Sequence, residues 1–166
     1  MGAFGLNNRA IAVVFARGSD DRIPLLNARF LSGKPLLHYT VEAALNSEYI
    51  SQVYVSTEDP RIANVALDAG AEVLHRPERL SRSQTPIYQA MEHAAAELAG
   101  PLSETGNTLL CIPADAVFCG TKQLDLALES YFQREYDQVI GLLPENKMYV
   151  IWREGDDKQI YPVIEP

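Results

Sequence analysis

The stretch AIAVVFARGSDDRIPLLN (residues 10–27) begins with six apolar residues and continues as a polar loop that contains Gly18. A short apolar run rich in β-branched residues, followed by glycine and charges, is typical of the first buried strand of a parallel α/β sheet. Ligands of such sheets bind beyond the carboxyl ends of the strands, where backbone N–H groups of a loop can surround an anion. We therefore expect a strand over 10–15 and an anion-binding loop after it, although Asp20 and Asp21 stand where a phosphate site favours lysine.

The rest of the chain alternates between strand-like segments and segments with helical spacing of apolar residues. Further strands are predicted over 52–57, 71–75, 108–112, 138–143, 148–152 and 161–164. Helices are predicted over 35–45, 61–69, 85–98 and 121–134. Gly70 is expected to end the helix over 61–69, and Thr85 and Pro86 to start the helix over 85–98. A polar connection is predicted over 101–107. This order predicts an α/β fold, a three-layer Rossmann-like and mostly parallel sheet with helices on both faces.

Composition narrows the class of protein. A length of 166 residues predicts a single domain over 1–166, and 47% hydrophobic residues suit a packed core. The net charge of −8 argues against nonspecific binding to nucleic acid or to an anionic membrane. No segment has the length and apolar character of a membrane span, and Cys111 and Cys119 form no CxxC pair, so we expect a reduced, cytoplasmic protein.

Seven short motifs follow one another in the order found in one enzyme family. They are IAVVFARG (11–18), IP (23–24) with Asn27, LSGKPLL (31–37), YTVEAA (39–44), VST (55–57), GAEV (70–73) and RPERL (76–80). Together they resemble the acylneuraminate cytidylyltransferases, or CMP–sialic acid synthetases. The resemblance is dense from residue 11 to residue 80 and continues element by element to the end of the sequence.

The resemblance implies a reaction in which the anomeric hydroxyl of an acidic sugar attacks the α-phosphate of CTP and releases pyrophosphate. It also implies Mg²⁺ as cofactor, CTP and an acidic sugar as ligands, and a homodimer. Family members continue past the segment that matches Tyr161 and Pro162, with an arm that enters the partner subunit's site and an acidic pair assigned to the metal. We expect the present sequence to lack this C-terminal extension.

Five residues match nucleotide-binding positions of the family. The resemblance assigns Ala16, Arg17 and Gly18 to the nucleotide loop, with Arg17 as the candidate catalytic residue because its fork of donors suits a phosphate. Asn27 and Arg76 are nucleotide contacts by the same match. For Arg76 the alternative is an ordinary surface arginine that follows a strand.

Three more candidates come from segments in which the match is looser. Gln84 and Thr85 could hydrogen-bond the edge of a pyrimidine, and Thr85 could equally serve only as a helix cap. Asp115 follows the strand predicted over 108–112 and resembles the metal-binding aspartate of other nucleotidyltransferases of this broad fold. Its alternative role is to cap the turn after the strand, because a single carboxylate is weak support for a magnesium site.

The loop departs from the family pattern in its charges. The two lysines of the family loop fall on Asp21 and Leu26, and an aspartate inverts the charge that a triphosphate needs. Asp20 and Asp21 could hold Mg²⁺ instead, or Arg22 could take the place of the lysine. The polar Gln-Pro-Thr-Ser element that meets the sugar acid in the family is also replaced, by the segment around Asp115.

Three hypotheses follow from these matches and departures. The first is a cytidylyltransferase-like protein that transfers CMP from CTP to an acidic sugar of the sialic acid type, with activity that the altered loop impairs. The second is a catalytically degenerate homologue, a pseudoenzyme, that binds a nucleotide or a protein partner. The third is a nucleotidyltransferase with a different substrate and with Asp115 on the metal.

Overall fold

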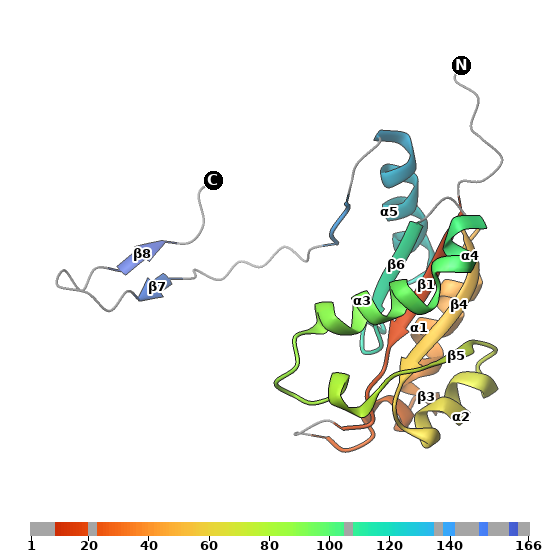
Figure 1. Ribbon diagram of the computed structural model, residues 1–166, viewed down its shortest axis with the longest axis vertical. Helices are drawn as coiled ribbons and strands as arrows, with labels where there is room; N and C mark the ends of the chain where they lie inside the picture. Colours follow the sequence, from red (N-terminus) through yellow and green to blue (C-terminus); the bar gives the residue numbers. More distant parts are fainter. Residues whose placement is uncertain are drawn as a thin grey trace.

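The fold is built on a four-stranded sheet (Figure 1). The structure is a computed structural model, and it describes residues 9–19, 23–104, 108–134, 138–141, 150–152 and 160–162. The strands are β1 (Ala10–Phe15), β4 (Ile50–Thr57), β5 (Glu72–His75) and β6 (Thr108–Pro113), in the order β5-β4-β1-β6. All pairs are parallel. Every residue of β1 is buried, as the apolar run predicted, because β1 lies between two neighbours and under helices on both faces.

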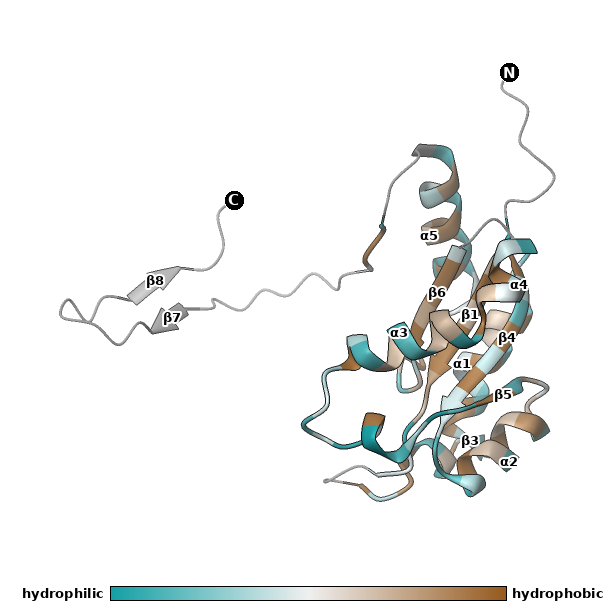
Figure 2. Ribbon diagram, viewed as in Figure 1, coloured by the Kyte–Doolittle hydropathy of each residue, from teal (hydrophilic) through white to brown (hydrophobic). Residues whose placement is uncertain are grey.

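The helices form two layers around this sheet, which confirms the predicted three-layer fold. On one face, α1 (Leu36–Leu45), α2 (Pro60–Asp68) and α5 (Thr121–Arg134) pack against the side of β1 that carries Ala12 and Val14. On the other face, α3 (Ile87–Glu97) and α4 (Ala99–Glu104) contribute to the core around Ile11 and Val13. Figure 2 shows the hydrophobic colour concentrated along the central strands.

The register brings the carboxyl ends of the strands to one edge of the sheet. Phe15, the last residue of β1, lies opposite Ser56 of β4 and Pro113 of β6, and Thr57 lies opposite His75 of β5. The segments that follow these strands therefore leave the sheet side by side. Ligands of open α/β sheets bind at this edge.

Helix α2 has both of its ends defined by local chemistry. Asp59 caps its N-terminus, because the carboxylate accepts a hydrogen bond from the N–H of Arg61 at 2.8 Å. Gly70 follows its C-terminus at φ +91°, and the N–H of Ala71 donates to the carbonyl of Ala66 at 3.0 Å. This is the glycine-terminated end that the sequence predicted.

Short elements that the sequence did not predict connect the main ones. They are the 3-10 helices η1 (Leu26–Ala28) and η2 (Glu78–Leu80) and the two-stranded hairpin of β2 (Phe30–Leu31) and β3 (Lys34–Pro35). Gly33 turns the hairpin at φ +97°, a conformation that favours glycine. The ammonium group of Lys34 pairs with the carboxylate of Glu42 and lies 4.3 Å from the centre of the Tyr39 ring.

Helices α1 and α2 differ from the predicted ranges by one residue at their ends, and larger differences occur at α3 and α4. Thr85 does not cap α3: the helix begins at Ile87, Pro86 is its N-cap residue, and the Thr85 hydroxyl instead donates to the carbonyl of Arg79 at 3.0 Å. Part of the predicted connection 101–107 is helical, because α4 continues to Glu104 and buries Leu102 against the sheet.

The predictions for the last strands have mixed outcomes. Residues 138–141 are not a strand, because they have no partner among the described residues, and 142–143 lie outside those residues. Strands β7 (Val150–Trp152) and β8 (Ile160–Pro162) form an antiparallel pair and overlap the strands predicted at 148–152 and 161–164. Residues 148–149 and 163–164 lie outside the described residues. None of the helices within the described ranges has both the length and the apolar character that a bilayer crossing requires.

Candidate functional site

A cavity of about 250 Å³ lies where β1 and β5 end and α3 begins. Its charged lining consists of Arg17, which follows β1, and Arg76 and Arg82, which follow β5. The remaining lining residues are Phe15, Leu80, Ser81, Thr85 and Ile87. Among the described residues, the lining includes three arginines and no acidic residue, in a chain whose net charge is −8.

The lining of this cavity combines cationic and apolar side chains, which suits an anionic ligand with an apolar part. Guanidinium groups bind phosphate and carboxylate oxygens, often through two parallel hydrogen bonds. The side chains of Phe15, Leu80 and Ile87 offer an apolar surface to a planar ring. The cavity therefore suits an anion that carries an uncharged, partly apolar group, as a nucleotide does.

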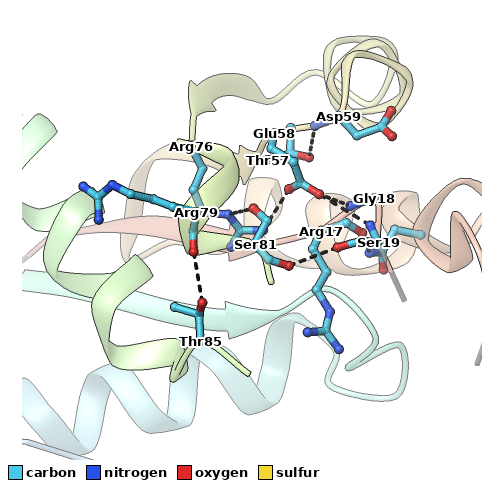
Figure 3. Close-up of polar contacts among 11 residues, drawn as sticks. Arg17, Gly18, Ser19, Thr57, Glu58, Asp59, Arg76, Arg79, Ser81 and Thr85 are labelled. Atoms are coloured by element: carbon cyan, nitrogen blue, oxygen red, sulfur yellow. Dashed lines mark hydrogen bonds and ion pairs between the residues drawn. The ribbon is translucent and has the colours of Figure 1, made fainter. Parts of the chain in front are cut away.

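The Glu58 carboxylate connects three loops at this edge of the sheet, as Figure 3 shows. Its Oε1 accepts hydrogen bonds from the N–H of Gly18 at 2.9 Å and of Ser19 at 3.4 Å. Its Oε2 pairs with Nη2 of Arg76 at 3.2 Å. Nε of Arg76 in turn donates to Oγ of Ser81 at 2.9 Å, so the guanidinium is held on two sides.

Burial and charge act against each other in this ion pair. Burial lowers the pKa of the Arg76 guanidinium, and the carboxylate of Glu58 opposes that shift. Burial also raises the pKa of the Glu58 carboxyl, but hydrogen bonds from Ser81, from the backbone N–H groups of Glu58 and Gly18, and from Arg76 outweigh it and hold the pKa below its ordinary value. Both side chains are therefore charged at neutral pH.

Backbone contacts fix the loop that follows β1. The N–H of buried Ala16 donates to the carbonyl of Ser56 at 3.1 Å, and the N–H of Leu25 donates to the carbonyl of Gly18 at 3.3 Å. Asn27 is buried, and its Nδ2 donates to the carbonyl of Arg17 at 3.0 Å. In this structure Asn27 therefore stabilises the loop, and its predicted contact with a nucleotide stays a prediction.

Gly18 allows the loop and the start of α2 to approach closely. A Cβ atom built on Gly18 would lie 2.4 Å from Cβ of Asp59, closer than real Cβ contacts come. No larger residue fits there without moving one of the two segments. The glycine that the sequence placed in an anion-binding loop is thus required first by packing.

The other predicted site residues divide between the cavity and the surface. Arg76 lines the cavity and is only 2% exposed, so its interpretation as a surface arginine is wrong. Thr85 also lines the cavity, whereas Gln84 is exposed and lies outside its lining. Figure 3 shows the side chain of Arg17 extending away from the cluster around Glu58. Asp20 to Arg22, with the proposed rescues of the missing lysine, lie outside the described residues.

Asp115 follows β6 at the same edge of the sheet as Arg17 and is exposed. It lines neither this cavity nor a second cavity that lies next to it. The described residues contain no group of three metal-ligating side chains. Magnesium takes six oxygen ligands, of which proteins often supply one or two. Asp115 by itself does not build a metal site.

Sequence reasoning missed Glu58, Ser81 and Arg82. A second cavity, of about 690 Å³, lies next to the first and shares Arg76, Ser81 and Arg82 with it, while Glu58 faces only this second space. The signal for Glu58 was its place directly after the strand predicted over 52–57, since polar residues at the carboxyl ends of parallel strands converge. No short-range pattern marks Ser81.

Comparison with known proteins identifies the family. The family model described as cytidylyltransferase matches residues 11–152. N-acylneuraminate cytidylyltransferase of Escherichia coli O18:K1:H7 (strain RS218 / NMEC) is 36% identical over 92% of the residues of this chain. The matched segment covers only 35% of the length of that relative.

Two solved structures share the fold at 16% identity. A CMP:2-keto-3-deoxy-manno-octonic acid synthetase complexed with CTP matches with a TM-score of 0.65, over 76% of this chain and 48% of the other. A 4-diphosphocytidyl-2C-methyl-D-erythritol synthase matches with a TM-score of 0.68, over 96% and 70%. The family match over most of the sequence confirms the resemblance seen in the motifs: the chain belongs to the cytidylyltransferase family.

Proposed function

We propose that this chain forms the nucleotide-binding part of a cytidylyltransferase that transfers CMP from CTP to an acidic sugar of the sialic acid type. The observation that carries the proposal is the cavity lined by Arg17, Arg76 and Arg82 at the carboxyl ends of β1 and β5. It lies at the edge of the sheet where α/β folds bind ligands, in a chain of the cytidylyltransferase family.

The chemistry asked of this site is mainly positioning and neutralisation of charge. In the proposed reaction the hydroxyl oxygen of the sugar forms a bond to the α-phosphorus of CTP and gives up its proton to solvent. The bond from that phosphorus to the pyrophosphate oxygen breaks, and pyrophosphate leaves. Fixed positive groups beside the phosphates stabilise the charge that develops on the leaving group. Arg17 is the proposed catalytic residue, and Arg76 and Arg82 are proposed to bind the nucleotide.

Other features of the proposal are expectations from the sequence. Mg²⁺ and a homodimer come from the resemblance to the family, Asp115 as a metal ligand comes from the resemblance to other nucleotidyltransferases of this broad fold, and a cytoplasmic location comes from composition. Asp115→Asn tests that ligand: loss of Mg²⁺-dependent CTP binding in this variant supports the assignment, and unchanged binding contradicts it.

Calorimetry tests the proposed function directly. CTP, ATP and GTP are titrated into the chain with and without Mg²⁺, and we expect binding of CTP alone. Arg17→Ala is expected to weaken CTP binding by about tenfold, which corresponds to about 1.4 kcal/mol and is modest for a charged hydrogen bond. A chain that binds none of the three nucleotides contradicts the proposal, and binding of ATP or GTP favours a nucleotidyltransferase with another substrate.

One observation favours a second candidate, a homologue that binds a nucleotide without turning it over. Among the described residues, no lysine lines either cavity, and Lys34 of the family motif pairs with Glu42. A pyrophosphate-release assay with CTP and sialic acid separates the two candidates. Release above background supports the transferase, whereas CTP binding without release supports the binding protein.

A further inference from the structure

Two of the three cavity arginines are connected to one partly buried carboxylate, that of Glu58. Arg76 is tied directly to Glu58, through Nη2 and Oε2 at 3.2 Å, and the side chains are 3% and 13% exposed. Arg17 is tied to Glu58 through the backbone, because the next residue, Gly18, donates its N–H to Oε1 of Glu58 at 2.9 Å. Glu58 itself does not line the arginine cavity.

Ser81 completes this arrangement from the third loop. Its hydroxyl accepts from Nε of Arg76 at 2.9 Å, and its carbonyl accepts from the hydroxyl of Ser19 at 3.0 Å. The segments after β1, β4 and β5 are therefore joined through side chains of Glu58, Arg76 and Ser81 (Figure 3). A guanidinium held by two partners loses little further freedom when a ligand binds to it.

We infer that Glu58 is a positioning residue for the nucleotide site: it holds Arg76 and the backbone next to Arg17 in place before an anion binds. The inference rests on the proposed function. Glu58 is assigned no contact with the nucleotide and no part in the chemistry. It acts by orienting Arg17 and Arg76, two of the three arginines that line the cavity.

The direction in which CTP affinity changes when Glu58 is neutralised separates a positioning role from a simple effect of charge. A negative charge near a phosphate site repels the ligand, so neutralising Glu58 should strengthen CTP binding if only its charge mattered. If Glu58 positions the arginines, neutralising it should weaken CTP binding, because Arg76 loses its charged partner and the loop loses its anchor.

The first experiment compares Glu58→Gln with Asp59→Asn by calorimetry of CTP binding to the full chain. Both changes remove one carboxylate charge from the same turn. Asparagine still caps α2, and Asp59 pairs with Arg61 rather than with a cavity arginine. We expect CTP to bind at least about tenfold more weakly to Glu58→Gln, the size of one charged hydrogen bond, and within about threefold of wild type to Asp59→Asn.

A double-mutant cycle shows whether Glu58 acts through Arg76. Arg76→Gln alone is expected to weaken CTP binding, and Glu58→Gln added to it should weaken binding by clearly less than its roughly tenfold effect in wild type, because only the anchor of the loop at Gly18 is left to lose. Removing both charges also avoids a lone buried charge that could unfold the chain. Additive losses contradict the inference.

Hydrogen exchange provides a readout without nucleotide. In ¹⁵N-labelled protein, the Gly18 amide and the Arg76 Nε–H should exchange more than about tenfold faster in Glu58→Gln than in wild type, while the core amides of β1 keep their protection. Unchanged exchange, or equal or tighter CTP binding by Glu58→Gln, overturns the inference and leaves the proposed function standing. A wild-type chain that binds no nucleotide overturns both.

Discussion

Gly18 combines two demands on a single residue, a close approach of backbone to backbone and an N–H group that donates to Glu58. We predict that Gly18→Ala lowers the free energy of unfolding by about 1–3 kcal/mol, the usual penalty for overpacking, because the new methyl group meets Asp59. Urea unfolding followed by circular dichroism measures it. Gly100→Ala, where nothing lies within 4 Å of the added Cβ, is the matched control and should cause no loss.

Glu58 should also give the chain part of its stability above acid pH. Its pKa in the folded chain is below the ordinary value of 4.5, so the unfolded state binds the proton more readily. The stabilisation is fully present above pH 4.5 and is lost as the pH falls through the lowered folded pKa. We predict that the difference in unfolding free energy between wild type and Glu58→Gln shrinks below pH 4.5. Parallel pH curves for the two proteins contradict this prediction.

At the scale of single elements, the turn between β4 and α2 contributes both a site contact and a helix cap. Glu58 and Asp59 are consecutive, yet the first faces the loops that follow β1 and β5, and the second caps the helix. The cap holds the turn that carries Glu58. Any variant that frays this helix start should therefore disturb the site as well.

Asp59→Ala tests the cap itself. The carboxylate accepts from the N–H of Arg61 at 2.8 Å, and its loss leaves that donor unpaired. We expect the free energy of unfolding to fall by about 1 kcal/mol in Asp59→Ala and much less in Asp59→Asn, since asparagine is an equally good N-cap residue. Thermal unfolding of the two variants side by side measures the difference. Equal losses would show that the ion pair with Arg61, and not the cap, stabilises this end.

At the scale of the whole molecule, β1 is the element on which both layers depend. Its side chains enter both cores, with Val14 on the side of α1 and α2 and Ile11 on the side of α3 and α4. We predict that Ile11→Ala, at a site with no exposed surface, lowers the free energy of unfolding by about 2–5 kcal/mol. Leu126→Ala, at an exposed position of α5, should change it by less than about 0.5 kcal/mol. Chemical denaturation of both variants checks the contrast.

The amino-acid sequence alone was sufficient for β1, for most of the helices and for the family. A continuous apolar run can be buried on both faces only in the middle of a covered sheet, and Gly70 ends α2 because it adopts a positive φ at little cost. The same local reasoning placed Arg17 and Arg76 at strand ends, where they line one cavity.

The contacts that hold those arginines in place were decided by tertiary structure. Glu58 and Arg76 are 18 residues apart in the sequence, and they pair because β4 and β5 are neighbours whose ends share one edge. In the same way, the hydroxyl of Thr85 donates to the carbonyl of Arg79 instead of capping α3, and residues 138–141, which have no strand partner within the described ranges, are not a strand. Local patterns set the conformations available to a segment, but a hydrogen bond or a strand pair also needs a second segment, and only the folded chain brings that segment within reach.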